Sequence, residues 1–181
     1  IAASTVDGNL TLTSGNASGI TDGGTLTIGG NLSAITDDNS GVVSLGTLAV
    51  DGTIALTTNG TNGNVTLVND VGLAFAASTV DGTLSATATT GNMTDSGALT
   101  ISGTSAFITS ANDATIALDT TTNAFTGAIT LTTNDSDGAV AHATIDGGTT
   151  ALVIAASTVD GDLTLTSGGA ITDGGTLTIG G

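Results

Sequence analysis

Hydrophobic and polar residues alternate strictly in short runs along the whole chain. Examples are residues 10–13, 25–28, 54–57 and 129–132, in which Leu or Ile takes every second position and Thr or Ala takes the others. A period of two sends the apolar side chains to one face of a β-strand and Thr to the other. Gly, Asn, Asp or Ser bounds each run, and these residues favour tight turns. The pattern predicts many short strands joined by sharp corners.

The sequence also repeats itself on a large scale. Residues 154–181 copy residues 1–30 with a short deletion and a few substitutions, and a looser third copy begins near Ala76. Ser4, Ser78 and Ser157 mark the three copies at nearly equal spacing. We interpret residues 1–153 as one large repeat and residues 154–181 as the start of the next. The chain is expected to be one continuous element, residues 1–181, cut from a longer protein.

A shorter period lies inside this repeat. Asp7, Asp22, Asp37 and Asp51 follow one another at nearly equal intervals. Such spacing predicts a β-solenoid with turns of roughly 14 to 20 residues. About ten such turns, stacked about 4.8 Å apart, would make a rod about 50 Å long.

Antiparallel hairpins are the main structural alternative, since Asn-Gly and Asp-Gly pairs favour two-residue hairpin turns. Hairpin partners need not share a sequence, whereas stacked turns place like residues over like, so the recurrence favours stacking. The predicted fold is therefore all-β, a parallel β-solenoid. Its interior would hold Leu, Ile and Val with Phe75, Phe107, Phe125 and Met93, and its exterior would hold Thr. The least regular part, residues 105–153, is expected to include a wider turn or loop at residues 113–123.

The composition limits the classes of function. The chain lacks Lys, Arg, Glu, Pro, Cys, Trp and Tyr, and it contains 39 Thr and 28 Gly. Leu, Ile, Val and Phe make up 44 of the 181 residues, which is above the level of about 20% typical of disordered chains. The absence of Cys excludes a disulfide framework and thiolate metal sites.

The net charge of −16 has no side-chain cation to balance it. The carboxylates therefore need water, backbone N–H groups or bound cations, and nucleic acid and anionic membrane surfaces should repel the chain. The longest apolar stretches, such as residues 152–156, are far too short to span a bilayer. We expect neither nucleic-acid binding nor membrane insertion.

The repeated motif, STVDGxLTLTSGGAITDGGTLTIGG, and the segment ANDATIALDTTTNAFTGAITLT resemble the repeats of very large secreted bacterial β-strand-repeat proteins, akin to filamentous haemagglutinin-type adhesins. The resemblance is clearest over residues 76–181. It implies a right-handed parallel β-helix, export to the cell surface, and a role in adhesion, matrix or filament building. It implies no catalytic residues.

Acidic pairs at the corners are candidate Ca²⁺ ligands, because this cation prefers carboxylate and carbonyl oxygens. The best local pairs are Asp37 with Asp38, Asp135 with Asp137, and Asp160 with Asp162. The alternative is that each Asp caps its own corner and solubilises the rod. The glycine-rich nonapeptide pattern of calcium-binding β-rolls is absent.

Outward Thr pairs resemble the Thr ladders of ice-binding solenoids. The pairs are Thr11 with Thr13, Thr25 with Thr27, Thr164 with Thr166, and Thr176 with Thr178. Residues 44–46 and 85–87 interrupt the array, and Thr is also an ordinary choice for the solvent face of a strand.

His142 is the only residue that could act as a general base near neutral pH. It stands alone, opposite the face expected for Val140, and its predicted role is structural. Seven glycosylation sequons arise from the Thr-rich composition, at Asn9, Asn16, Asn31, Asn59, Asn64, Asn92 and Asn134. No catalytic, cofactor-binding or metal-binding residue is assigned, and the chain is not expected to be an enzyme.

The sequence thus predicts a structural extracellular or cell-surface β-solenoid, either a filament subunit or an adhesin stalk. Its main partner would be itself, through head-to-tail or lateral association, because neither end shows a polar or proline-bearing cap. The alternative function is a module that binds cell-surface glycans through its strand faces or residues 105–153. Ice binding and calcium binding are further alternatives.

Overall fold

The structure is a computed structural model that describes residues 1–37, 39–60, 62–136 and 140–181. Its described residues form 23 β-strands and no helix, and the strands pair in parallel. The chain winds into a β-solenoid of about eight turns. The predicted fold class is confirmed.

The strands form two parallel sheets that face each other across one core. The twelve-stranded sheet contains β1 (Ser4–Val6), β3 (Ile20–Thr21), β4 (Leu26–Ile28), β6 (Val43–Val50), β8 (Val65–Asn69), β11 (Leu84–Ala88), β14 (Ser105–Asn112), β17 (Ile129–Asn134), β19 (Leu152–Ile154), β20 (Ser157–Val159), β22 (Ile171–Asp173) and β23 (Leu177–Ile179). The eleven-stranded sheet contains β2 (Leu10–Ser14), β5 (Leu32–Thr36), β7 (Thr53–Thr58), β9 (Leu73–Phe75), β10 (Ser78–Val80), β12 (Met93–Asp95), β13 (Leu99–Ile101), β15 (Ile116–Leu118), β16 (Ala124–Phe125), β18 (Ala143–Asp146) and β21 (Leu163–Thr166).

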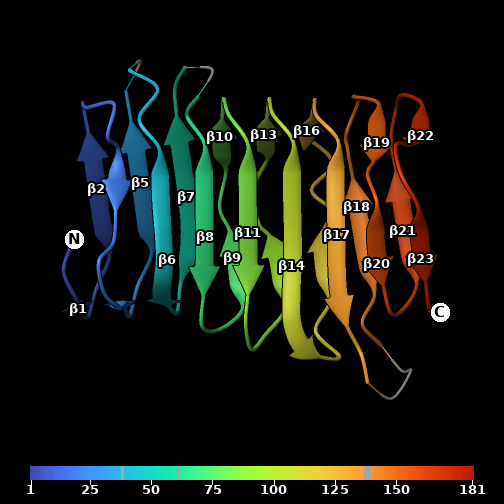
Figure 1. Cartoon of the computed structure of the whole chain (residues 1–181), viewed down its shortest axis with the longest axis horizontal. Helices are drawn as coiled ribbons and strands as arrows, with labels where there is room; N and C mark the ends of the chain where they lie inside the picture. Colours follow the sequence, from blue (N-terminus) through green and yellow to red (C-terminus); the bar gives the residue numbers. More distant parts are fainter. Residues whose placement is uncertain (38, 61, 137–139) are drawn as a thin grey trace.

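Figure 1 shows the direction of winding. The chain advances from the N-terminus at the left to the C-terminus at the right. Strands β8, β11 and β14 of the twelve-stranded sheet lie in front and run downward, and the fainter strands β10 and β13 of the other sheet run upward behind them. This is a right-handed winding, as the family resemblance implied.

Most turns are longer than the sequence spacing predicted. Leu10 pairs with Leu32, and Leu32 pairs in turn with Ile54, so these three residues occupy one position in three successive turns. Val65 and Leu84 form one of the most closely spaced pairs. Since nearly all other paired positions lie further apart in the sequence, the solenoid has about eight turns rather than ten.

The short Asp interval marks corners rather than whole turns. Asp7 and Asp51 occupy the same corner two turns apart, with Gly29 between them: Gly29 N–H bonds to Val6 O and Asp51 N–H bonds to Ile28 O. Asp22 follows β3 and Asp37 follows β5, so both lie elsewhere around the turn. Because Asp recurs at several corners of one turn, its spacing underestimated the turn length.

The three copies of the repeat do not share one face. Ser4 in β1 and Ser157 in β20 lie in the twelve-stranded sheet, whereas Ser78 in β10 lies in the eleven-stranded sheet. The stretch from Ser4 to Ser78 therefore contains an additional half turn. The same local sequence forms a strand of either sheet, because both sheets bury the same alternating apolar positions.

The core is a continuous double layer of Leu, Ile, Val and Ala side chains, and the residues at its centre are fully buried. The predicted inward positions of Met93 and the three Phe residues are confirmed. Phe107 meets Phe75 and Phe125 edge to face, with ring centroids 6.3 and 5.9 Å apart. Edge-to-face pairs stabilise a core beyond their buried area.

The irregular region lies within the predicted residues 105–153. Of residues 113–123, Ile116–Leu118 form strand β15, and residues 119–123 beyond it are in no strand. The widest sequence spacing between paired residues of the described strands separates Ile116 from Ala143. The extra length falls between β17 and β18, where the described residues beyond Asn134 are in no strand.

The two terminal turns leave apolar side chains uncovered on their outer edges. Ile171, Leu177 and Ile179 are 46%, 36% and 40% exposed, although their counterparts inside the rod are buried. At the other end, Leu10 and Leu12 are only partly buried. No helix among the described residues has the length and hydrophobicity needed to cross a membrane.

Candidate functional site

Two carboxylates of the acidic pairs proposed for calcium, those of Asp37 and Asp160, accept hydrogen bonds within the chain. Asp37 accepts hydrogen bonds from Asn39, from its backbone N–H at 3.1 Å and its Nδ2 at 2.8 Å, which caps the local corner. Asp160 accepts from the N–H of Asp135 at 3.0 Å. The partners proposed for two of the pairs, Asp38 and Asp137, lie outside the described residues. Within the described part of the chain, no three His, Cys, Asp or Glu side chains gather around one point.

Asp22 and Asp95 link their own turn to the next one. The Asp22 carboxylate accepts from the N–H of Gly46 at 3.1 Å and from both the N–H and the hydroxyl of Thr47 at 2.8 Å. Asp95 does the same at a later turn, accepting from the N–H of Asp119 and from Asn123 Nδ2 at 3.2 and 2.6 Å. Each carboxylate therefore bridges two turns of the solenoid.

These bonds change the acidity of Asp22. Desolvation by burial, the largest contribution, raises the pKa of Asp22, but the Thr47 hydroxyl and the backbone N–H groups of Gly46 and Thr47 lower it. The net result is a pKa below the ordinary value, because the charged form accepts more hydrogen bonds than the neutral one.

The Ser-Thr-Val-Asp motif makes a second contact between turns, which we call the Ser–Asp clasp. In the central copy, Ser78 Oγ accepts from the N–H of Leu56 at 3.0 Å. The N–H of Asp81 donates to Thr58 Oγ1 at 3.2 Å, and its carboxylate accepts from the N–H of Gly60 at 3.1 Å. Two residues of one turn thus hold three groups of the preceding turn.

The third copy of the motif repeats this clasp atom for atom. Ser157 Oγ accepts from the N–H of Leu131 at 2.9 Å. Asp160 N–H donates to Thr133 Oγ1 at 3.0 Å, and the Asp160 carboxylate accepts from Asp135 N–H at 3.0 Å. Because the two copies lie in different sheets, the clasp belongs to the motif and not to one face of the rod.

The first copy of the motif lies on the N-terminal edge of the solenoid. Its Ser4 and Asp7 are exposed, whereas Ser78 and Ser157 are buried. The Ser4 hydroxyl nevertheless donates to Ala2 O at 2.9 Å, just as Ser78 and Ser157 donate to the carbonyl two residues earlier. The Ser4 hydroxyl therefore makes the same local hydrogen bond as in the other two copies, although no described turn precedes it.

Asparagine side chains form a further set of bonds at the corners. Asn9 Oδ1 accepts from Asn31 N–H at 2.8 Å, and Asn31 Oδ1 accepts from Thr53 N–H at 2.9 Å. Asn64 and Asn92 accept in the same way from the following turn. The remaining sequon residues also bond locally or to the preceding turn, namely Asn16, Asn59 and Asn134. The sequons thus coincide with residues that stack the turns or shape a corner.

His142 occupies one of these Asn positions. Its Nδ1 accepts from the N–H of Asp162 at 2.8 Å, which requires an unprotonated Nδ1. The Asp162 carboxylate lies 3.6 Å from the same nitrogen, but the shorter backbone bond defines the contact. His142 therefore joins its own turn to the following turn through a hydrogen bond. Val140, two residues earlier, is exposed.

Sequence reasoning missed two buried amides. Asn69 accepts from Val50 N–H at 2.8 Å and donates to Val50 O at 3.1 Å and to Gly72 O at 2.7 Å. Asn123 accepts from Leu99 N–H at 2.7 Å and donates to Asp95. The sequence did carry a signal for Asn69, because this residue lies at an inward-facing position of an alternating run, where an apolar residue is expected.

The Thr pairs do not form one ladder. Thr11 and Thr13 lie in the eleven-stranded sheet with Thr164 and Thr166, whereas Thr27 and Thr178 lie in the other sheet. Within one outward column, Thr11 is followed by Ser33 and Ala55. The regular single-face array that ice binding requires is therefore broken on both sheets.

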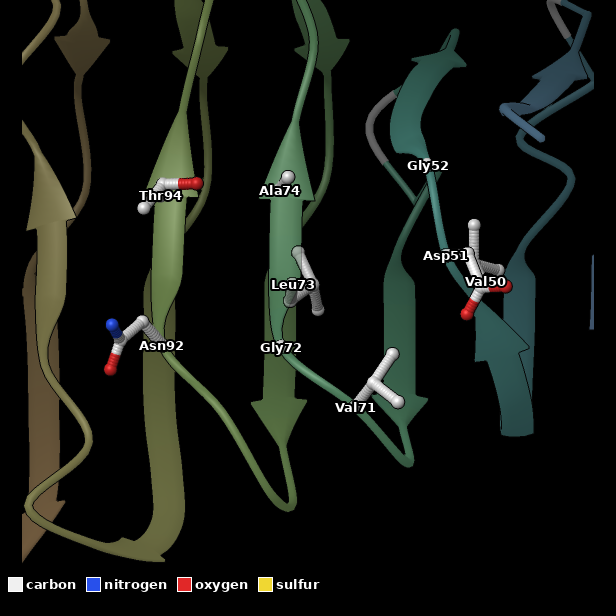
Figure 2. A pocket seen from close by; sticks show the side chains of 9 residues that line it. All are labelled: Val50, Asp51, Gly52, Val71, Gly72, Leu73, Ala74, Asn92 and Thr94. Carbon is white, nitrogen blue, oxygen red and sulfur yellow. The ribbon is translucent and has the colours of Figure 1, made fainter. Parts of the chain in front are cut away.

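A shallow hollow of about 330 Å³ lies beside the corner at Gly72 (Figure 2). Val50 and Asp51 line one side of it, and Asn92 and Thr94 line the other. Asp51 supplies its only ionisable group, and Asn92 Oδ1 is already bonded to Thr115 N–H at 2.9 Å. All three aromatic residues of the chain are buried, so the hollow lacks the aromatic lining that ligand sites favour.

Comparison with known proteins assigns the repeat to a family but identifies no function. A family model described as repeats of unknown function matches residues 62–132 and 134–181, more than half of the chain. No curated protein and no solved structure matches.

Proposed function

We propose that this chain, which belongs to the DUF5649 family of repeats of unknown function, is a structural repeat that builds the length of an extracellular or cell-surface rod. In this proposal it acts as a stalk or filament segment, catalyses no reaction and needs no cofactor. Its partners are further solenoid turns like its own.

One observation carries the proposal: the recurring side-chain interactions join one turn to the next. The Ser–Asp clasp, the corner amides and the Asp22 and Asp95 carboxylates all span residues about one turn apart. Such contacts make a continuous rod in which each turn is supported by its two neighbours.

The charge of the surface supports end-to-end over side-to-side association of such rods. The chain carries a net charge of −16 and no Lys or Arg, so exposed faces of neighbouring rods repel unless cations screen them. Growth at the ends is therefore favoured over side-to-side adhesion. Adhesin activity stays part of the proposal because the resemblance of the motifs implies it.

The test is location and shape in the cells that produce the protein. Antibody against the chain should label intact cells, and electron microscopy of the released protein should show rods whose length grows by about 4.8 Å per turn. Labelling only after the cells are permeabilised, or compact particles without a long axis, would contradict the proposal.

A further inference from the structure

We infer that the N-terminal edge of the solenoid, formed by Ser4 and Asp7, is a register-specific docking edge for a solenoid turn carrying a Leu-Thr-Thr-Asn strand. This inference rests on the proposed structural role, and it names the partner that the edge selects.

The first argument is a sequence coincidence that the structure explains. The tetrapeptide Leu-Thr-Thr-Asn occurs twice in the chain, at residues 56–59 and 131–134. Each occurrence lies one turn before a Ser-Thr-Val-Asp motif and receives its clasp. The remaining Ser-Thr-Val-Asp motif, residues 4–7, has no such turn before it in this chain.

The second argument is the chemistry of the clasp. Thr58 Oγ1 donates to Gly63 O at 2.7 Å while accepting from Asp81 N–H, and Thr133 Oγ1 donates to Ala141 O at 2.8 Å while accepting from Asp160 N–H. The second Thr of the tetrapeptide thus uses its hydroxyl as both donor and acceptor, which a Val or Leu cannot do.

The Asn of the tetrapeptide extends the contact in the other direction. Asn59 Nδ2 donates to Thr36 O at 2.9 Å, and Asn134 Nδ2 donates to Ser110 O at 3.0 Å. Leu-Thr-Thr-Asn therefore bonds to both of its neighbouring turns, which makes it a linking strand and not only a receptor for the clasp.

The third argument is that the edge is already in its bound geometry. On the side facing the next turn, Ser4 pairs with Leu26 as Ser78 pairs with Leu99 and Ser157 with Leu177. On the open side, the N–H and carboxylate of Asp7 bond to no other residue in the described part of the chain. A docking turn would meet preorganised groups, which lowers the entropy cost of binding.

A second copy of the chain offers a poorer partner. Its C-terminal turn presents β21 (Leu163–Thr166) and β23 (Leu177–Ile179), which read Leu-Thr-Leu-Thr and Leu-Thr-Ile. Neither strand contains the Leu-Thr-Thr order that supplies the Leu N–H and the second Thr hydroxyl to the clasp. End-to-end association of two copies is therefore the competing outcome and not the proposal.

The chain itself supplies the test. Residues 154–159 are identical to residues 1–6, so placing a second copy of residues 129–153 directly before Ile1 recreates the natural junction that leads into β20. In the extended chain, the Asp7 amide should gain the hydrogen bond that Asp160 N–H makes to Thr133. Its hydrogen exchange, followed by mass spectrometry or NMR, should slow on the order of tenfold relative to the original chain.

Matched variants separate the clasp from general end protection. Thr133→Val in the added turn should abolish the extra protection of Asp7, whereas Thr132→Val, on the outward side of the same added strand, should keep it. Ser4→Ala should lower the unfolding midpoint of the extended chain and leave that of the original chain unchanged.

Three results would overturn the inference. One is an unprotected Asp7 amide in the extended chain while core amides near Phe107 stay protected, whether the added turn is disordered or out of register. Another is equal protection with Thr133→Val in the added turn. The last is protection of Asp7 in the original chain that rises with protein concentration, which would favour a second copy as partner. None of these results depends on where the protein resides in the cell.

Discussion

The backbone N–H of Asp162 donates a 2.8 Å hydrogen bond to Nδ1 of His142, one turn earlier along the solenoid. Asn31 makes the equivalent bond to Thr53 N–H at 2.9 Å. The single histidine is thus interchangeable in role with an asparagine at a corner.

Replacing His142 tests that equivalence. His142→Asn should leave the free energy of unfolding nearly unchanged, because Asn Oδ1 supplies the same acceptor. His142→Leu should lower it by about 1 kcal/mol, the net worth of one hydrogen bond. Urea unfolding at neutral pH measures both, and equal destabilisation by the two variants would show that the ring packs rather than accepts.

Glycine at the Asp-Gly corners is required by close approach of the preceding turn. A Cβ added to Gly52 would lie 2.5 Å from Gly30 O, whereas one added to Gly8 would meet nothing within 4 Å. Gly52→Ala should therefore lower the free energy of unfolding by about 1–3 kcal/mol, and Gly8→Ala should be near neutral. Thermal unfolding of the matched pair checks this; a neutral Gly52→Ala would mean that the corner can shift.

The lowered pKa of Asp22 predicts a dependence of stability on pH. Because the folded-state pKa lies below the unfolded-state value, Asp22 contributes stability above the ordinary pKa of 3.8. That contribution is lost as the pH falls through the folded-state pKa. Unfolding midpoints measured from neutral to strongly acidic pH should fall less in Asp22→Asn than in the original chain.

Asp173 provides the control for this experiment. It ends the same Ile-Thr-Asp sequence in the last copy of the repeat, but it is exposed and lies in the last described turn. Asp173→Asn should leave the pH profile of the original chain intact. A profile altered equally by both substitutions would point to net charge rather than to the bonds from Gly46 and Thr47.

Asn69 should be among the least replaceable polar residues in the core. Asn69→Leu keeps the size of the side chain but leaves Val50 N–H and the carbonyls of Val50 and Gly72 without a partner. Each unsatisfied buried group costs about 1–3 kcal/mol, so the free energy of unfolding should fall by at least about 2 kcal/mol. Val68→Thr, at the neighbouring outward position, should change it little. Chemical unfolding monitored by circular dichroism compares the two.

The residue pattern within a single strand was sufficient to predict which of its side chains are buried. Period-two alternation placed Met93, Phe75, Phe107 and Phe125 inside, because which face of a strand is buried is a property of that strand alone. The predicted length of a solenoid turn was too short. Asp-Gly corners recur more than once in each turn, and nothing in the local sequence distinguishes one corner from another.

The contacts between turns could not be predicted from the pattern within a strand. The clasp joins Ser78 to Leu56 and Ser157 to Leu131, at separations of 22 and 26 residues. Its partners differ in sequence from the motif itself, so self-similarity does not reveal them. Only the register of the wound chain brings a Ser hydroxyl to a Leu amide.

The alternation of repeat copies between the two sheets has a consequence for how such genes can change. Loss of the stretch between Ser4 and Ser78 would shift everything downstream by half a revolution, so every later strand would exchange sheets. Loss of the whole unit between Ser4 and Ser157 would leave each strand on its own side, because both residues lie in the twelve-stranded sheet. Recombination between near-identical copies can therefore shorten or lengthen the rod in phase only in whole large units.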